Sequence, residues 1–366
     1  MLSPGNKQYQ CPAADEVELS IFGPGYGECV VAHIGNNDWL VIDSCLENEA
    51  KRAVALEYLE RLGVDVASAV RVVVATHWDD DHIVGLADIC RASVSAKFVC
   101  SAAMTSEQFE SILATWRLRS FLPGGSGIDE MDAIIQVLEN RGAVSASAQK
   151  VLWSSDEPTR VEVRALSPSE AAVAAMIGRF ADAAAQASGT PLSRRLPNIV
   201  DNHASVVIGL AVGDARALLG SDLQMRSDRH FGWFAIIDAF SGAQRYQTYK
   251  VAHHGSSNAD HDDIWQKLLQ PEPIAAVTPF VRGGTHLPTN DDCDRIRRRT
   301  SEAYLTSPAR PQRFRDRNPR AERLMRRFSR QLYSVPSRFG HVRLRKKTTS
   351  ANSNWNVSLF GAATKL

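Results

Sequence analysis

The chain has 366 residues, and its 42 Lys and Arg against 41 Asp and Glu leave a formal net charge of +1. This length allows one large α/β domain or two smaller ones, and the near-neutral balance excludes overall charge as a reason to bind nucleic acid or a membrane surface. The six cysteines form no Cys-x-x-Cys pair, the first 16 residues are polar, and no stretch reaches the roughly 18 apolar residues of a membrane span. We therefore expect a cytoplasmic protein with reduced thiols, no secretory signal and no membrane partner.

The N-terminal part predicts two hairpins followed by a helix and a buried strand. A Gly-Pro-Gly-Tyr-Gly turn at 23–27 and an Asn-Asn-Asp turn at 36–38 separate runs of strand-forming residues. Apolar residues at helical spacing predict a helix over 48–62 that ends at Gly63. The predicted strands are 17–22, 28–34, 39–43 and 70–75, and the β-branched run of the last is typical of a strand buried on both faces.

The rest of the chain predicts a helical region followed by a second set of strands. Residues 101–195 read mostly as helix, with a strand near 161–166 and an Ala-rich helix over 170–187. Further strands are predicted at 205–210, 215–219, 249–252 and 274–278. Hairpins, then helices, then more strands fit one α/β domain over 1–366, with two packed sheets, helices outside and 101–195 as a helical insertion.

The predicted strand 70–75 runs directly into Thr76-His77-Trp78-Asp79-Asp80-Asp81-His82. Loops that a rigid scaffold holds are where binding and catalytic residues gather. Acids packed this closely would repel one another and raise each other's pKa, and a divalent cation removes that penalty. A solvated acidic loop that caps the following helix is the alternative interpretation.

This segment resembles the metallo-β-lactamase superfamily signature His-x-His-x-Asp-His, with Asp79 in place of the second histidine. The variant is similar to the hydrolase domain of the ComEC-type DNA-uptake proteins. Gly23 to Glu28 resembles that family's Gly-rich first turn, although the Asp that usually precedes the turn is missing. Further matches follow in the family's order: Val41-Ile42-Asp43, Asn202-His203-Ala204-Ser205, Leu218-Leu219-Gly220-Ser221-Asp222, Tyr249 to Ser256, and His286-Leu287-Pro288. The resemblance implies an αββα sandwich.

The resemblance also implies a dinuclear metal site. His77 and Asp79 would hold one ion, Asp81 and His82 the second, and Asp222 would bridge the two. Either His253 or His254 would complete the second site, and Asp43 would orient a ligand or the attacking water. For the first ion, Asn202 fits the family motif and His203 is the better ligand chemically. Because Asp79 adds an oxygen ligand, Mn²⁺ is preferred, with Zn²⁺ as the other candidate.

Three more residues of the resemblance have two interpretations each. Lys250 would stabilise a developing phosphate charge, or is a strand lysine whose charged end reaches solvent. His286 would donate a proton to the leaving group, or is structural. Ser256 is expected, with Asn202 and His203, to lie among the substrate-binding residues. It is expected to hydrogen-bond its loop rather than act as a nucleophile.

The segment 310–347 is strongly basic and contains interleaved aromatic residues, with a basic insertion over 308–335. A helix over 319–332 would carry Arg323, Arg326 and Arg327, which suit contact with a phosphate backbone, or would simply be a solvated helix. Together these features predict a phosphodiesterase or nuclease that uses a dinuclear-metal-activated water on DNA or another nucleic acid. The alternatives are a hydrolase of a small phosphodiester, such as a cyclic nucleotide or a phosphorylcholine ester, and a binding module with a degenerate site. The oligomeric state stays open.

Overall fold

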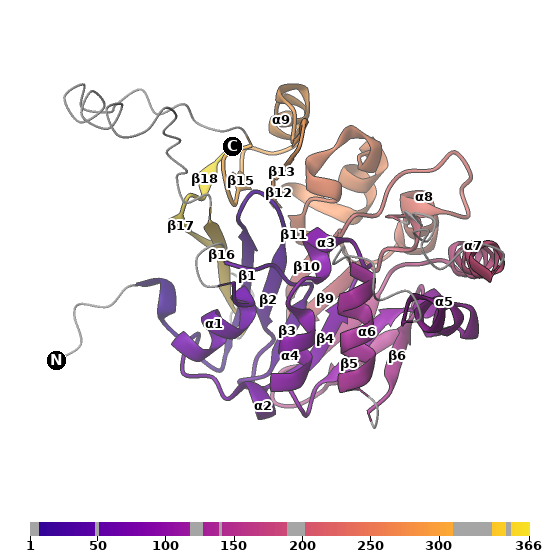
Figure 1. The fold of residues 1–366 in the computed structure, drawn as a ribbon. Coiled ribbons are helices and arrows are strands. Elements are labelled where there is room, and N and C mark those ends of the chain that lie inside the picture. The colour runs from indigo at the N-terminus through magenta and orange to yellow at the C-terminus, as the bar shows by residue number, and fades with distance from the viewer. Residues whose placement is uncertain are drawn as a thin grey trace, which may run out of the picture.

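In the computed structural model, which describes residues 7–47, 51–117, 127–138, 141–188, 202–309, 339–348 and 353–366, two eight-stranded sheets pack face to face with helices outside them (Figure 1). The predicted α/β sandwich is therefore confirmed. Apolar side chains from both sheets, among them Leu19, Val72, Leu210 and Leu219, form the buried layer between the sheets.

The first sheet is antiparallel at one edge and parallel at the other. Its order is β17 (Asn356–Gly361), β16 (Gly340–Lys347), β1 (Glu16–Gly23), β2 (Cys29–His33), β3 (Trp39–Ile42), β4 (Val70–Ala75), β5 (Lys97–Ser101) and β6 (Ala143–Ala146). Pairing is antiparallel from β17 to β3 and parallel from β3 to β6. The strands β2 and β3 are wholly buried, as their continuous apolar runs require.

The second sheet has its parallel strands in the middle. Its order is β18 (Thr364–Lys365), β15 (Ala303–Leu305), β12 (Leu269–Val277), β11 (Tyr246–Lys250), β10 (Ala215–Leu219), β9 (Ile208–Val212), β8 (Val161–Ala165) and β7 (Val151–Ser155). The strands β10, β11, β12 and β15 are parallel. A separate hairpin of β13 (Phe280–Arg282) and β14 (Thr285–Leu287) follows β12.

Helices cover the outer face of each sheet. Those that pack with the first sheet are α1 (Val54–Arg61), α2 (Val66–Ala69), α3 (Asp80–Ile83), α4 (Leu86–Ala92), α5 (Glu107–Arg117), α6 (Gly127–Val137) and α7 (Glu170–Ser188). The second sheet is covered by α8 (Gly232–Phe240), α9 (Asn290–Arg297) and the π-helical turn Ile264–Leu268. Short 3-10 turns lie at Lys7–Tyr9, Ala102–Thr105, Asn202–Ala204, His253–Gly255 and Ser257–Ala259. Among the helices of the described ranges, none has the length and apolarity needed to cross a bilayer.

The region 101–195 differs from its predicted, mostly helical character. Besides α5, α6 and α7 it contains β6, β7 and β8, which are edge or near-edge strands of the two main sheets. Only β8 was predicted, because β6 and β7 are short and partly exposed and lack a clear alternation of apolar and polar residues. The helix predicted over 48–62 begins at Val54, and the basic helix predicted over 319–332 lies outside the described residues.

The strand topology determines where polar loops meet. Parallel strands β3 and β4 in one sheet and β10, β11 and β12 in the other end at the same side of the sandwich. In open α/β sheets, ligand sites form outside the carboxyl ends of such strands. The loops after these five strands carry the polar residues of the candidate site.

Candidate metal centre

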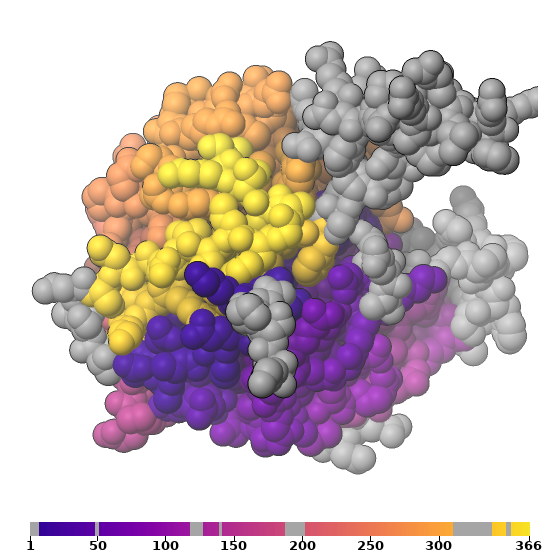
Figure 2. Space-filling view, turned by 90° about the vertical axis from the view of Figure 1, so that its left-hand side faces the viewer, coloured from indigo at the N-terminus to yellow at the C-terminus, as the bar shows by residue number. Residues whose placement is uncertain are grey.

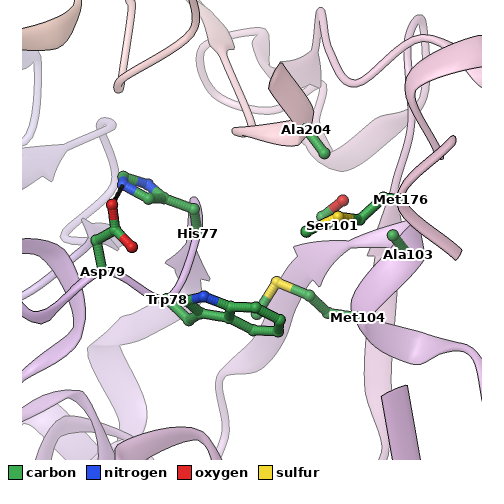
Figure 3. A pocket seen from close by; sticks show the side chains of 8 residues that line it. All are labelled: His77, Trp78, Asp79, Ser101, Ala103, Met104, Met176 and Ala204. Carbon is green, nitrogen blue, oxygen red and sulfur yellow. Dashed lines mark ion pairs between the residues drawn. The ribbon is translucent and has the colours of Figure 1, made fainter. Parts of the chain in front are cut away.

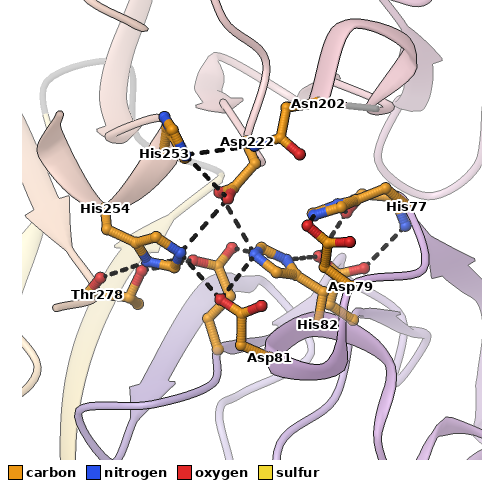
Figure 4. Close-up of polar contacts among 12 residues, drawn as sticks. His77, Asp79, Asp81, His82, Asn202, Asp222, His253, His254 and Thr278 are labelled. Atoms are coloured by element: carbon orange, nitrogen blue, oxygen red, sulfur yellow. Dashed lines mark hydrogen bonds and ion pairs between the residues drawn. The ribbon is translucent and has the colours of Figure 1, made fainter. Parts of the chain in front are cut away.

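The loops after β3, β4, β10 and β11 bring carboxylates and imidazoles into one cluster (Figure 4). Asp43 follows β3, the segment 77–82 follows β4, Asp222 follows β10, and the pair His253-His254 follows β11. The residues of this cluster that are buried are Asp43, His77, Asp81, His82, Asp222 and His254. The structure thus brings together side chains that the sequence places in four separate segments.

Four of these residues are spaced as the ligands of one cation. His254 Nε2 lies 3.1 Å from Asp81 Oδ2 and 3.4 Å from Asp222 Oδ2. His82 Nε2 lies 3.4 Å from Asp222 Oδ1 and 3.7 Å from Asp81 Oδ2. Tetrahedral ligand atoms bonded at about 2.1 Å would be about 3.4 Å apart. The measured spacing surrounds one position that is suited to a divalent ion.

A second group lies on the other side of His82. His77 Nε2 is 3.7 Å from Asp79 Oδ2 (Figure 3), and the ring centroids of His77 and His82 are 4.1 Å apart. Asp222 directs one carboxylate oxygen to His82 and the other to His254, which belong to the first group. Its charge also acts on His77 and Asp79 of the second group, so Asp222 is the acid that both groups share.

The two pairs of alternative ligands differ in their placement. His253 Nε2 is 3.9 Å from Asp222 Oδ2, which is farther than His254 Nε2, and it contacts Asn202 Nδ2 at 3.3 Å. The Asn202 side chain is drawn beside Asp222 and His253 in Figure 4, and its Oδ1 is buried without a hydrogen-bond partner. His203 Nδ1 is likewise buried without a partner, but within the described ranges no hydrogen bond joins His203 to this cluster. The geometry thus favours His254 over His253, and the contact with His253 places Asn202 at the cluster.

Hydrogen bonds orient the imidazoles so that Nε2 faces inward. His254 Nδ1 lies 2.8 Å from the Thr278 carbonyl and His82 Nδ1 lies 2.8 Å from Asp43 Oδ2. Both partners can only accept, so each Nδ1 carries the proton. Thr76 Oγ1 donates to Asp43 at 2.7 Å and must then accept from His77 Nδ1 at 3.0 Å. All three Nε2 atoms therefore present a lone pair to the cluster when the rings are neutral.

These inward-facing atoms lie close to one another but make no hydrogen bond. The Nε2 atoms of His77, His82 and His254 and the Oδ1 of Asp222 are buried without a hydrogen bond. Buried polar atoms in native proteins are nearly always satisfied, so a convergent group of exceptions requires an explanation. Divalent cations held by the two groups would satisfy all of these atoms, and the donor set fits such ions.

Charge interactions within the cluster shift several pKa values. Burial alone would lower the pKa of His254, but the nearby carboxylates of Asp222 and Asp81 raise it to about 10. Burial also acts to lower the pKa of His82, but the charges of Glu28, Asp222 and Asp81 raise it well above its usual range. Without metal, protons on these two rings would offset the carboxylates. By contrast, burial and the nearby His82 lower the pKa of His77 to about 4, so its ring is neutral at neutral pH.

Burial and the charge of Asp81 also act on Asp79. Together they raise the pKa of Asp79 to about 6. For Asp81 itself, the positive charges of His82 and His254 outweigh burial and lower the pKa to about 2. The predicted rise in pKa from repulsion between the acids is therefore found for Asp79. For Asp81, the two imidazolium rings outweigh that repulsion.

The sequence analysis missed Glu28, which lies against the outer side of the two rings. Its carboxylate is ion-paired with Lys250, accepts a hydrogen bond from Thr278 Oγ1 at 2.5 Å, and lies 3.6 Å and 3.7 Å from Nδ1 of His82 and His254. One ligand atom each of Glu28, His82, Asp222 and His254 lies within 4.8 Å of the others. Because the carboxylate faces Nδ1 atoms and already has two partners, we interpret Glu28 as support for the ligands. The signal for it was an acid directly before the apolar strand Cys29–His33.

This contact also determines the position of Lys250. Its side chain is fully buried, and its ammonium is directed to Glu28 behind the two imidazoles rather than to the open side of the cluster. The interpretation of Lys250 as a strand lysine whose charged end reaches solvent is wrong, because the chain end meets a buried carboxylate.

The backbone is strained at the cluster. Asp43 (φ 58°), Ser221 (φ 45°), His253 (φ 47°) and His254 (φ 54°) all adopt left-handed conformations that L-residues rarely adopt. Such residues cost of the order of 1–3 kcal/mol each and gather where a functional geometry requires them. Here they turn successive side chains inward at the ends of β3, β10 and β11.

The hairpin β13–β14 borders the cluster. The Phe280 ring lies 5.2 Å from the His254 ring and 5.4 Å from the Tyr26 ring. His286, on the second strand, is half-buried, and its Nδ1 has no hydrogen-bond partner. Ser256 donates its backbone N–H to the His253 carbonyl at 2.9 Å. Arg323, Arg326 and Arg327 lie outside the described residues.

A small apolar cavity adjoins His77 and Asp79 (Figure 3). Trp78, which lies between these two ligands in the chain, stacks on Phe109 of α5 at 5.1 Å and packs against Phe180 of α7 at 5.3 Å. The cavity measures about 10 Å³, which is room for roughly one water molecule. The helices α5 and α7 thus close this side of the cluster.

Comparison with known proteins agrees with this picture. Residues 22–121, which carry Asp43 and the 77–82 segment, match the family model described as Metallo-beta-lactamase superfamily. This segment, less than a third of the chain, is thus similar to the metallo-β-lactamase superfamily, and the two packed sheets with helices outside agree with an αββα sandwich. Members of this superfamily are mostly metal-dependent hydrolases that bind divalent ions such as zinc. The finer, ComEC-type resemblance stays a prediction.

Several solved structures are similar at low identity. The metallo-beta-lactamase fold protein YhfI from Bacillus subtilis is 10% identical over 79% of this chain and 95% of its own, with a TM-score of 0.36. The short form of human tRNase Z is 11% identical over 63% of this chain and 76% of its own, with a TM-score of 0.30. A metallo-beta-lactamase from Pontibacter korlensis is 15% identical over 58% of this chain and 72% of its own, with a TM-score of 0.27. No curated protein matches the chain.

Proposed function

We propose that this protein is a metal-dependent phosphodiesterase that acts on DNA or another nucleic acid. The observation that carries the proposal is the group of unpartnered inward-facing atoms on His77, His82, His254 and Asp222. Their spacing and their outer hydrogen bonds match what a catalytic metal site requires.

Charge balance supports two divalent ions. Glu28, Asp43, Asp79, Asp81 and Asp222 contribute five negative charges and Lys250 one positive charge, which leaves four. Two divalent cations supply that charge. His77, Asp79 and Asn202 would hold one ion, and Asp81, His82 and His254 the other, with Asp222 shared. The Asp79 and Asn202 oxygens favour Mn²⁺, whereas Zn²⁺ suits the imidazoles.

The protein's own groups have separable tasks in this proposal. Two divalent ions, when bound, supply an activated water and positive charge for the transition state. Asp43 and the Thr278 carbonyl keep the Nε2 lone pairs of His82 and His254 directed inward. Lys250 acts by holding Glu28 behind these rings, so we revise its proposed role from substrate contact to positioning. His286 stays our candidate for protonating the leaving group.

A basic groove supports nucleic acid as the substrate class. Its lining includes Lys7, Arg343, Arg345, Lys346 and Lys347 with one acid, Glu16, and it measures about 530 Å³. Arg345 and Lys346 are ion-paired with Glu18 and Asp214, and Arg343 is buried, so Lys7 and Lys347 are the lysines of this lining that are exposed to a ligand. Figure 2 shows the face where the C-terminal strands, in yellow, meet the N-terminal residues, in indigo. Phosphates are usually contacted by such Arg and Lys side chains together with Ser and Asn. In the register of β1 and β16, Lys347 lies opposite Glu16 at one end and Gly340 lies opposite Gly23 at the other. The candidate metal centre is at the Gly23 end of β1, so the groove at the Glu16 end lies about 25 Å away along the strand.

A small phosphodiester is the second candidate. The packing of α5 and α7 on Trp78 favours it, because these helices close one side of the cluster next to His77 and Asp79. A closed side restricts the size of the group that can reach the ions.

A metal-dependence panel tests the proposal. The full chain loaded with Mn²⁺ or Zn²⁺ should cut single- or double-stranded DNA or RNA, and the double variant Asp81→Ala, His82→Ala should not. Lys347→Glu should lower nuclease activity and its salt sensitivity, while Lys150→Glu, a matched exposed lysine, should have no effect. Turnover of cyclic nucleotides but not of nucleic acids would favour the second candidate. Loosely held, substoichiometric metal without turnover would instead indicate a degenerate binding module.

A further inference from the structure

The hairpin β13–β14 holds an exposed arginine at the rim of the metal centre. The Val281 N–H donates to the Gly25 carbonyl at 2.5 Å, which attaches the hairpin to the turn before Glu28. Phe280 packs between the rings of Tyr26 and His254. The strand that carries Arg282 is therefore attached on both sides to segments of the site.

Arg282 itself is held by Tyr26 and Asp80. Its guanidinium lies over the Tyr26 ring, 4.6 Å from the centroid, and donates to the Tyr26 hydroxyl. Nη1 lies 3.5 Å from the carboxylate of Asp80, the residue directly before the candidate ligand Asp81. The Arg282 side chain is 59% exposed, so the remaining N–H donors face solvent beside the metal ligands.

We propose that Arg282 binds the anionic phosphoryl group of the substrate and that Tyr26 holds the guanidinium in position for it. The planar fork of an arginine matches two phosphate oxygens, and stacking on an aromatic ring reduces the freedom lost on binding. The contact with Asp80 is a solvent-exposed pair, which contributes at most about 1 kcal/mol, so a phosphate can displace it. This inference rests on the proposed phosphodiesterase function.

The charge distribution of the site gives the physical reason for such a residue. The cluster is rich in carboxylates, and Lys250 is buried behind it against Glu28. An anionic substrate would meet Asp80 at the entrance beside Arg282, because that carboxylate is partly exposed. Arg282 supplies an accessible positive charge at that entrance, and it distinguishes an anionic diester from a neutral ester.

Binding of inorganic phosphate to the metal-loaded full chain tests this role without relying on turnover. Titration calorimetry should give a dissociation constant on the order of tenfold higher for Arg282→Ala than for the wild type, because a hydrogen bond to a charged group contributes about that factor. Arg282→Lys should lie between the two. Arg297→Ala, which removes another exposed arginine paired with an aspartate, is the matched control and should bind phosphate like the wild type. Equal phosphate affinity in the wild type and Arg282→Ala, or no phosphate binding by the wild type, overturns the inference.

Kinetics then separate this inference from the proposed function. With bis(p-nitrophenyl) phosphate, Arg282→Ala should raise KM about tenfold, whereas with the uncharged diethyl p-nitrophenyl phosphate KM should change less than about twofold. Equal losses on both esters, or a lowered metal content, would indicate a structural role and sink the inference. Absence of turnover in the wild type would count against the phosphodiesterase proposal alone, since the phosphate titration still decides the role of Arg282.

Discussion

The substitution Asp43→Asn should weaken metal binding although Asp43 is not expected to touch the metal. The carboxylate accepts three hydrogen bonds: from Thr76 N–H at 2.8 Å, from Thr76 Oγ1 at 2.7 Å and from His82 Nδ1 at 2.8 Å. An amide can accept on one side only, so at least one of these donors would face an NH₂ group. If that donor is His82 Nδ1, the ring must move its proton to Nε2 and can no longer bind a cation.

The expected magnitude follows from those bonds. Loss of an outer hydrogen-bond partner typically lowers metal affinity by 10- to 100-fold, which corresponds to about 1.4–2.8 kcal/mol. The metal-free protein should also lose about 1.5–3 kcal/mol of unfolding free energy, because a buried charge-assisted hydrogen bond is broken. Competition with a chromophoric chelator measures the first effect, and urea unfolding in EDTA measures the second.

A matched control is Asp38→Asn. Asp38 is a largely buried aspartate that accepts a hydrogen bond from Arg71 at 2.6 Å and lies at the opposite end of β3. Its substitution removes one charge and weakens one bond but should leave metal affinity unchanged. If Asp43→Asn bound metal as tightly as the wild type, the reasoning that Asp43 sets the His82 tautomer would be wrong.

Three further predictions follow from the same geometry. In the metal-free protein, the raised pKa values of His82 and His254 contribute stability that is fully present below about pH 6.5. This stability is lost as the pH rises through the two raised values, of which that of His254 is about 10. The lowered pKa of Asp81 contributes stability that is lost as the pH falls from about 4 to 2. Unfolding free energy in EDTA should therefore be highest between about pH 4 and 6.5 and should fall above it by up to about 1.4 kcal/mol per pH unit for each imidazole; a flat profile would contradict this. Glu28→Gln or Lys250→Met should each cost about 3–5 kcal/mol by leaving one buried charge unpaired, and the double variant should cost less than the sum, as a double-mutant cycle of urea unfolding would measure. Asp79→His should raise the affinity for Zn²⁺ relative to Mn²⁺ by at least several-fold in paired chelator titrations, because it replaces a hard oxygen with an imidazole; an unchanged ratio would place Asp79 outside the metal's ligands.

The sequence by itself determined the elements whose signals are local. The β-branched run of β4 and the His77–His82 segment after it are contiguous. A buried strand followed by a polar loop with candidate ligands could therefore be predicted without a structure. The hairpins of β1 to β3 and the long helix α7 also follow from periodicity and turn residues. These features were sufficient to predict a two-sheet sandwich with a polar loop at a strand end.

Only the tertiary structure distinguished His254 from His253, because the two are adjacent and both have left-handed backbone conformations that turn their rings differently. Glu28 gained its role only through contacts across the sandwich, since its hydrogen-bond partner Thr278 is 250 residues away in the chain. Arg282 likewise reaches the rim of the metal centre because the hairpin β13–β14 packs on the turn at 23–27. Spacing along a chain reveals which groups are present, but the burial and direction of a side chain depend on the segments that pack around it.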